Sequence, residues 1–292
     1  MPAPYDALAK AHPCFASGGK PANTGRIHLP VSPGCNIGCK FCCPSFSTEK
    51  NAPAVTSEVI RPDKAIEVVR RSLELCPDIT VVGIAGPGDT LATPWALQTF
   101  QLIDKEFPFL FKCMSTNGLL LPEKAEDVLE AGIDSLTVTV NAIDPALEAQ
   151  LNDYVIYHGK RYEGKEAAEL LIENQLKGIA KVAQGGTTVK VNTVLTPGIN
   201  DGHIEAIAKA VSDAGAKIYN VIPLIPQGGL ADVPRPTCRQ VDAARVAAEP
   251  YISVFRHCQH CRADAIGIPG GRDYGQQIYL KRIAGKETFS HG

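Results

Sequence analysis

Short β-type segments alternate with amphipathic helical segments along most of this chain, and this alternation is what most constrains its fold. Strands that alternate with helices pair in parallel through right-handed crossovers, which is typical of the α/β class. Six segments have the composition expected of strands. They are residues 26–31, 79–85, 110–115, 135–140, 187–195 and 217–224.

Helical periodicity fills the intervals between the expected strands. The expected helices are residues 62–75, 95–107, 122–131, 146–183, 204–214 and 238–248. The long 146–183 pattern must be interrupted at Tyr157, His158 and Gly159, and again at Gly164. Six strand–helix units are fewer than the eight of a complete barrel. The alternation of strands and helices alone therefore fits either a partial barrel or an open sheet. In both folds the functional loops follow the carboxyl ends of the strands.

Charge and cysteine content narrow the class of protein. The 29 Lys and Arg nearly balance the 31 Asp and Glu, and no basic stripe indicates nucleic-acid or membrane binding. The chain has no apolar run of the roughly 20 residues that span a bilayer, and its first residues lack a signal peptide, so we expect a cytoplasmic protein. Four of its ten cysteines lie between positions 35 and 43, which favours metal or cluster ligation over disulfides.

The strongest motif is a C-x₃-C-x₂-C run directly after the first expected strand, formed by Cys35, Cys39 and Cys42. Thiolates are the ligands of iron–sulfur clusters. Three of them leave one iron of a four-iron cluster without a protein ligand, and that iron can chelate a small molecule. A zinc loop is the alternative interpretation.

This loop, placed after the first strand of a six-unit chain, resembles that of the radical S-adenosylmethionine (SAM) superfamily. The resemblance implies a partial (β/α)₆ TIM-like barrel, with N- and C-terminal extensions covering its mouth. It also implies that the cluster of Cys35, Cys39 and Cys42 is catalytic and binds SAM. Residues near later strand ends are then expected to contact SAM, although Asn117-Gly118 also fits an ordinary turn. These are Gly86, Gly88, Asp89, Ser115, Thr116, Asn117, Asn141 and Asn192.

Further ligand-type residues lie outside the loop. Cys258 and Cys261 form a C-x₂-C pair, which is half of a metal site, and Cys14 in the leader is the candidate to complete it. His28 and Cys113, on the first and third strands, could share another site. His257 and His260 flank the tail pair; we expect neither to be a ligand, and a ligand or supporting role is the alternative interpretation.

Several stretches resemble, over nearly the whole chain, the radical SAM enzymes that assemble the nitrogenase cofactor. They include HPCF, IHLPVSPGCNIGCKFC, GIAGPGD, CMSTNGLLLP, LTVTVNAIDP, NTVLTPGIND and HCQHCRADAIGIPGG. The resemblance implies that two additional [4Fe–4S] substrate clusters are fused into an [8Fe–9S–C] precursor, with a carbide from SAM and an extra sulfur. It assigns His28 and Cys113 to one substrate cluster. The other is assigned to Cys14, Cys258 and Cys261.

The chain departs from that family at one expected ligand. Family members carry another cysteine five or six residues beyond the triplet, where this chain reads Phe46-Ser47-Thr48. Cys43 is the nearby thiol, and we hypothesise that it replaces the missing ligand. The implied partners are SAM, an iron–sulfur cluster donor, an electron donor and, because no carrier-like domain follows, a separate cofactor carrier.

We expect three parts: a leader over residues 1–25 with one cluster ligand, a radical SAM barrel over 26–250, and a capping extension over 251–292 with the C-x₂-C pair. Two other functions remain open, namely a radical SAM enzyme with auxiliary clusters acting on a peptide or small organic substrate, and a non-catalytic iron–sulfur scaffold. Asp89, Arg262 and Asp264 are expected to form surface salt bridges rather than to transfer protons. Cys76 and Cys238 are expected to be buried or partly buried.

Overall fold

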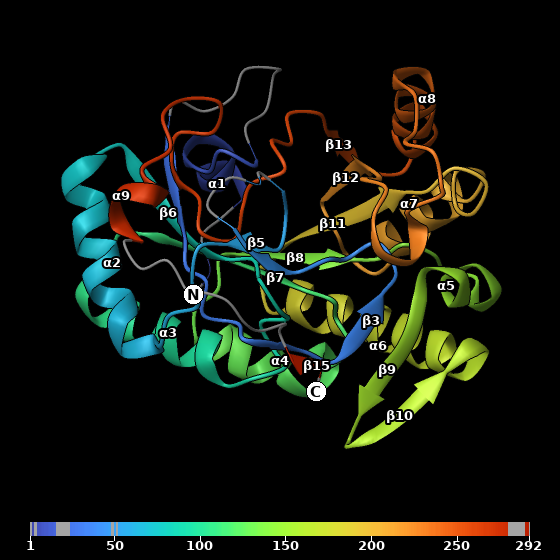
Figure 1. Ribbon diagram of the computed structural model, residues 1–292, viewed down its shortest axis with the longest axis horizontal. Helices are drawn as coiled ribbons and strands as arrows, with labels where there is room; N and C mark the ends of the chain where they lie inside the picture. Colours follow the sequence, from blue (N-terminus) through green and yellow to red (C-terminus); the bar gives the residue numbers. More distant parts are fainter. Residues whose placement is uncertain are drawn as a thin grey trace.

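The computed structural model describes residues 2, 5–15, 24–47, 50, 52–279 and 290–291. Its centre is a mostly parallel sheet, with the described strands in the order β13-β12-β11-β8-β7-β6-β1-β14 (Figure 1). The six parallel strands expected from the sequence are all present. They are β1 (Gly25–His28), β6 (Ile79–Ile84), β7 (Phe111–Thr116), β8 (Ser135–Thr139), β11 (Thr188–Leu195) and β12 (Ile218–Pro223). The predicted α/β class with a partial parallel barrel is confirmed.

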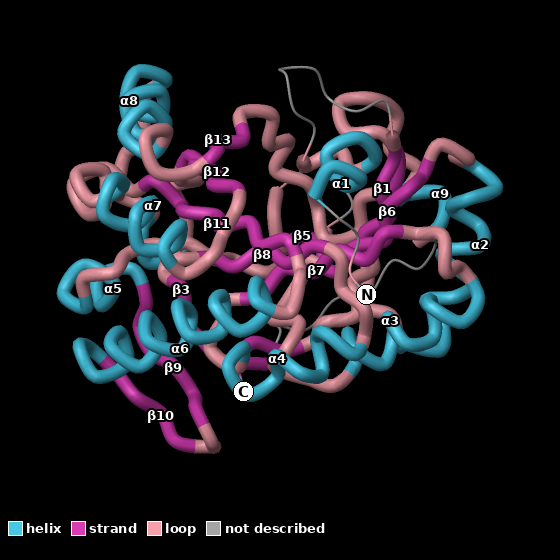
Figure 2. The backbone as a smooth tube through the Cα atoms, turned by 180° about the vertical axis from the view of Figure 1, so that it is seen from behind, coloured by secondary structure: helices cyan, strands magenta, loops and turns pink. Residues whose placement is uncertain are grey.

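Helices follow the outer side of this sheet, as seen from the two opposite directions of Figures 1 and 2. Their apolar faces and the outward residues of the strands form one large core, which includes Val82, Phe100 and Met114. The described helices are α1 (Tyr5–Ala11), α2 (Pro62–Leu75), α3 (Trp95–Glu106), α4 (Leu121–Glu130), α5 (Pro145–Leu151), α6 (Gly164–Gln184), α7 (Ile204–Asp213), α8 (Cys238–Ala248) and α9 (Gly275–Ile278), with the 3₁₀ turn η1 (Gly228–Leu230). None of the helices in the described part of the chain has the length and apolarity needed to cross a bilayer.

The pattern over residues 146–183 is interrupted at both predicted places, His158-Gly159 and Gly164, but the segment between α5 and α6 is not helical, contrary to expectation. After α5 the chain forms a hairpin, β9 (Asn152–Tyr157) and β10 (Lys160–Glu163), before α6 begins. The turn between the strands is His158-Gly159, with φ of 50° and 73°. Positive φ at both central turn residues matches the twist of two-residue hairpins. The run Asn152–Tyr157 is also rich in residues that favour strands.

The tail contributes to both edges of the central sheet. Its strand β13 (Ser253–Phe255) pairs parallel with β12, and β14 (Ile266–Gly267) pairs antiparallel with β1. Near its end, β15 (Ser290–His291) pairs with β2 (Gly34–Cys35). The remaining described strands are β3 (Ile37–Cys39), β4 (Ser45–Phe46) and β5 (Val55–Thr56). The tail therefore crosses the barrel from its last parallel strand back to its first.

The two cysteines not assigned to clusters differ in exposure. Cys76 is buried beside α2, as expected. Cys238 is exposed, so the expectation that it is buried or partly buried is wrong. It is the first residue of α8 and lies where the chain enters the helix.

Candidate functional site

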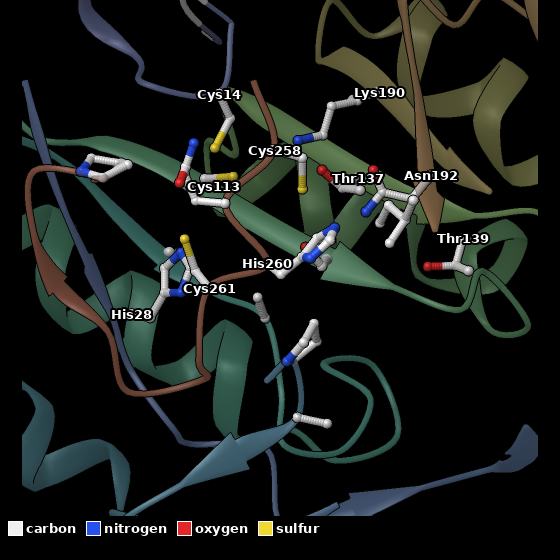
Figure 3. A pocket seen from close by; sticks show the side chains of 18 of the residues that line it. Cys14, His28, Cys113, Thr137, Thr139, Lys190, Asn192, Cys258, His260 and Cys261 are labelled. Atoms are coloured by element: carbon white, nitrogen blue, oxygen red, sulfur yellow. The ribbon is translucent and has the colours of Figure 1, made fainter. Parts of the chain in front are cut away.

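One cavity of about 310 Å³ runs along the inner side of the barrel strands toward their carboxyl ends. Its walls come from β1, β6, β7, β8, β11 and β12, and from the leader and the tail. Among its lining residues are seven of the nine ligands proposed from the sequence, as Figure 3 shows in part. The seven are Cys14, His28, Cys42, Cys43, Cys113, Cys258 and Cys261.

The loop that carries Cys35, Cys39 and Cys42 is braced by the hairpin. Strand β3 pairs with β9, with Cys39 opposite Asn152. The loop then turns back on itself, because the Cys42 N–H donates to the Cys39 carbonyl at 3.0 Å. Of the three cysteines in the triplet, Cys42 lines the cavity, whereas Cys35 and Cys39 do not.

Burial dominates the chemistry of these three thiols. It raises the pKa of Cys35 to about 11 and that of Cys42 to about 12, and it also raises the pKa of Cys39. Neighbouring triplet thiols raise the pKa values of Cys39 and Cys42 further, so the sulfurs lie close to one another. Three soft sulfur donors grouped in a desolvated loop fit a resident [4Fe–4S] cluster, whose irons would displace the protons.

No three described His, Cys, Asp or Glu side chains converge closely enough to hold a single metal ion. The ligands of a four-iron cluster each bind a different iron, and they therefore stand farther apart than the ligands of one ion.

Asp89 ties the ends of two barrel strands together. Its carboxylate accepts from the Thr116 hydroxyl at 2.9 Å and from the Asn117 N–H at 2.6 Å. Asn117 in turn donates to Asn36 Oδ1 at 2.7 Å, within the cluster loop. Asp89 is 5% exposed, so the expected surface salt bridge is wrong. Burial raises the pKa of Asp89, and the hydrogen bonds that it accepts oppose that shift.

The two glycines proposed to contact SAM are close to other parts of the protein. A Cβ on Gly88 would overlap the carbonyl oxygen of Gly34, next to Cys35. Gly86 has a φ of +124°, and a Cβ there would lie 3.6 Å from that of Ala263 in the tail. Glycine at position 88 therefore allows the second strand's loop to lie against the cluster loop.

The other residues proposed to contact SAM divide between the cavity wall and its support. Ser115 and Asn192 line the cavity, and Asn192 Oδ1 accepts a hydrogen bond from Asn220. Asn141 does not line it, because its Oδ1 accepts the Val194 N–H at 2.9 Å. Thr137 and Thr139 add hydroxyl groups to the wall that the sequence interpretation missed.

His28 is arranged as a neutral nitrogen ligand. Its Nδ1 donates to the Arg262 carbonyl at 2.9 Å, which leaves Nε2 unprotonated. Burial, reinforced by the charge of Arg26, lowers the pKa of His28 to about 4. In the sheet, Gly83 lies between His28 and Cys113, and a Cβ at that position would be 3.2 Å from the His28 ring. The glycine therefore leaves room for the imidazole beside the Cys113 thiol.

The leader and the tail meet over the same wall. Cys14 and Cys258 pack against an apolar cluster of Phe15, Ile218 and Phe255. Burial raises the pKa of Cys14 to about 12, and the thiols of Cys261, Cys113 and Cys258 act in the same direction. These sulfurs therefore lie within electrostatic reach of one another (Figure 3). His257 and His260 line the same cavity.

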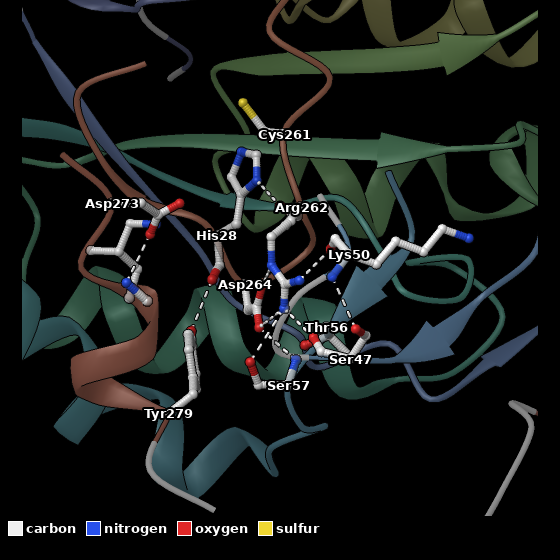
Figure 4. Close-up of polar contacts among 12 residues, drawn as sticks. His28, Ser47, Lys50, Thr56, Ser57, Cys261, Arg262, Asp264, Asp273 and Tyr279 are labelled. Atoms are coloured by element: carbon white, nitrogen blue, oxygen red, sulfur yellow. Dashed lines mark hydrogen bonds and ion pairs between the residues drawn. The ribbon is translucent and has the colours of Figure 1, made fainter. Parts of the chain in front are cut away.

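A buried ion pair ties the tail to the segment after the cluster loop (Figure 4). The Arg262 guanidinium forms two hydrogen bonds with the Asp264 carboxylate, at 2.8 and 2.9 Å. It also donates to the backbone carbonyls of Ser47 and Lys50, while Asp264 accepts the Ser57 N–H. The side chains of Arg262 and Asp264 are only 13% and 2% exposed, so the expectation that they form a surface salt bridge is wrong. The same Arg262 orients His28 through its carbonyl.

Glu148 of α5 is a buried acid close to Cys39. Asn152 donates to its Oε1, but Oε2 has no hydrogen-bond partner among the described residues. Burial raises the pKa of this carboxyl to about 8. The folded protein therefore retains a proton at neutral pH that the unfolded chain releases.

Glu148→Gln is expected to stabilise the apoprotein more at pH 8 than at pH 5. Because the folded pKa is above the unfolded value of 4.5, the wild type loses stability as pH rises from about 4.5 to 8. Glutamine removes that loss, on the order of 4 kcal/mol at pH 8. Thermal unfolding at both pH values measures it, with the exposed Glu126→Gln of α4 as the control. An equal effect of Glu148→Gln at the two pH values would contradict the assignment.

The chain is similar in sequence and in fold to known proteins. The model of the radical SAM superfamily matches residues 29–211. A radical SAM methyltransferase from Sphaerobacter thermophilus, 18% identical, superposes with a TM-score of 0.58 over 82% of this chain and 69% of its own. The FeMo cofactor biosynthesis protein NifB of Methanocaldococcus infernus is 44% identical over 95% of this chain and 92% of its own length. NifB of Klebsiella pneumoniae is 39% identical over 92% of this chain and 59% of its own length.

The fold and the matched region define a radical SAM enzyme, a class that implies a [4Fe–4S] cluster and SAM. Within that superfamily, the chain belongs to the NifB family.

Proposed function

We propose that this enzyme fuses two [4Fe–4S] substrate clusters into an [8Fe–9S–C] precursor, with a carbide derived from a SAM methyl group and one added sulfur. Membership of the family supports a radical SAM role in FeMo cofactor biosynthesis. We propose in addition that two clusters are fused and that a carbide is inserted. The observation that carries this proposal is that seven of the nine proposed ligands, drawn from leader, barrel and tail, line one cavity.

In this proposal Cys35, Cys39 and Cys42 hold the resident cluster. When bound and reduced, this cluster and SAM supply a 5′-deoxyadenosyl radical. The protein's own contribution is placement and exclusion of water. Asp89 and Asn117 hold the loops beside the resident cluster, and Asn192 with Ser115 provides polar groups on the cavity wall.

His28 and Cys113, with Cys43, are proposed to bind one substrate cluster, and Cys14, Cys258 and Cys261 the other. Each set has three ligands, so neither substrate cluster is enclosed by four thiolates. A neutral imidazole binds iron less firmly than a thiolate, which suits a cluster that must leave its ligands. The tautomer of His28 set by Arg262 supports this role.

The proposed organisation keeps three parts. The leader over residues 1–25 carries Cys14, the barrel over 26–250 holds SAM, and the extension over 251–292 brings Cys258 and Cys261. The proposed partners besides SAM are an iron–sulfur cluster donor, an electron donor and a carrier that accepts the product.

Anaerobic reconstitution with iron and sulfide, followed by reduction in the presence of SAM, tests the function. We expect formation of 5′-deoxyadenosine and a product that activates a nitrogenase apoprotein lacking its cofactor. Absence of SAM cleavage would indicate a scaffold. SAM cleavage without activation would indicate a radical SAM enzyme with another substrate.

Cys43→Ala is expected to remove about four iron atoms per chain, because it breaks a three-ligand set. The Cys43 thiol lines the cavity, and a Cβ on Gly228 in η1 would be 3.2 Å from its sulfur. Thr48, at the site of the missing family cysteine, lies outside the described residues. Iron analysis and EPR measure the effect, with Cys238→Ala as the exposed-thiol control. Full cluster content in Cys43→Ala would refute the replacement.

A further inference from the structure

Two buried cations in the cavity wall have no use in the function described so far. Arg26 of β1 is 6% exposed and Lys190 of β11 is 7% exposed. Both line the cavity, and neither forms an ion pair with a carboxylate among the described residues. A buried cation without a counter-charge is strongly destabilising, so an anion is expected to compensate it when the site is filled.

The two cations approach the same group of thiols from two different strands, β1 and β11. Arg26 Nη2 donates to Cys261 Sγ at 3.2 Å, and its Nε has no hydrogen-bond partner among the described atoms. The Lys190 ammonium extends toward the sulfurs of Cys14 and Cys258 (Figure 3), and its charge lowers the pKa of Cys14 against the effect of burial. Both charges therefore act on the set formed by Cys14, Cys258 and Cys261, and they also act on the other set, because both lower the pKa of His28 and Lys190 lowers that of Cys113.

The remaining contacts of Lys190 do not balance its charge. Its Nζ lies 5.4 Å from the ring centre of Phe15 and 5.6 Å from that of Phe255. Such cation–π contacts stabilise a charge by less than its burial costs. An anion bound in the cavity near Arg26 and Lys190 would therefore compensate their charges.

A substrate cluster on this set would be that anion. An oxidised [4Fe–4S] core with three thiolates carries a formal charge of about −1, and one-electron reduction makes it about −2. A set that includes neutral His28 carries one negative charge fewer. The two buried cations thus match the more negative of the two ligand sets.

We propose that Lys190 and Arg26 are positioning residues that neutralise the substrate cluster held by Cys14, Cys258 and Cys261, retain it in the cavity and favour its reduction. This inference rests on the proposed function for the identity of the anion as a substrate cluster. It gives the two substrate sites unequal charge and unequal ease of reduction.

Lys190→Met tests it in the full-length, anaerobically reconstituted protein. Methionine has a similar length but no charge. We expect loss of up to about four iron atoms per chain on gel filtration. In the remaining protein, the ratio of reduced to oxidised cluster at a fixed solution potential should fall roughly tenfold to hundredfold for one substrate cluster. EPR-monitored redox titration measures this ratio.

Three comparisons separate a role in charge compensation from a role in folding. Lys190→Arg keeps the charge and should retain the iron and the potential. Lys209→Met removes an exposed lysine of α7 and should change neither. The apoprotein of Lys190→Met should be as stable as the wild type or melt a few degrees higher, because an uncompensated buried charge is gone.

Unchanged iron content and unchanged potentials in Lys190→Met would overturn the inference. So would a lower melting temperature of its apoprotein together with loss of the resident cluster, since that pattern indicates a structural lysine. The proposed function fails by a different result, namely wild-type holoprotein that binds clusters and cleaves SAM but yields no activating product.

Discussion

Cys42→Ala is expected to lower production of 5′-deoxyadenosine from SAM by at least about 100-fold, because it leaves the resident cluster with two protein ligands. Cys42 is the member of the triplet that lines the cavity, and burial raises its pKa to about 12. Chromatographic measurement of 5′-deoxyadenosine under reducing conditions gives the result. Iron analysis should show a parallel loss.

Cys238→Ala is the matched control for this variant. Cys238 is exposed at the start of α8 and does not line the cavity, so its loss should leave SAM cleavage unchanged. The cavity-facing position of Cys42 makes a folding defect small, which thermal unfolding of the apoproteins checks. Cleavage by Cys42→Ala at more than a tenth of the wild-type rate would refute the assignment of the resident cluster.

Cys258→Ala is expected to lower the ratio of activating product to 5′-deoxyadenosine by at least about 100-fold. It removes one ligand of a substrate cluster and spares the triplet, so consumption of SAM becomes uncoupled from product. Activation of a nitrogenase apoprotein measures the product. Iron content should fall by about four atoms per chain.

Cys14→Ala should have the same effect, since Cys14 is proposed to bind the same cluster as Cys258. Ligands that act as one unit are not additive, so Cys14→Ala combined with Cys258→Ala should be no worse than either alone. Losses of iron that add in the double variant would show that the two cysteines serve different sites.

The strands could be predicted from the sequence because they are expressed in local patterns, whereas the ligand sets stay predictions, seven of whose nine members line one cavity. Cysteine spacing and strand–helix rhythm need only short windows. The hairpin of β9 and β10 was missed because its residues continue an apparently helical pattern on both sides. Its signal was the His158-Gly159 turn, which also brings β9 against the cluster loop.

The burial of four charged side chains was not predicted, because charged residues are by default expected to be exposed. These four are Arg26, Lys190, Arg262 and Asp264. Arg262 and Asp264 compensate each other only because the tail folds back over the segment after the cluster loop. Lys190 and Arg26 had a usable signal. Each lies two residues from a proposed site residue on its own strand, Asn192 and His28, and alternate residues of a strand share a face.

The crossing of the tail from one edge of the sheet to the other has a consequence for biogenesis. Cys14 emerges from the ribosome long before Cys258 and Cys261, and the strands β13 and β14 that flank this pair can pair only after β12 and β1 have formed. The proposed ligand set of Cys14, Cys258 and Cys261 is thus completed only after the tail has been synthesised. Cluster insertion at this proposed site is therefore expected to follow synthesis and folding of the tail.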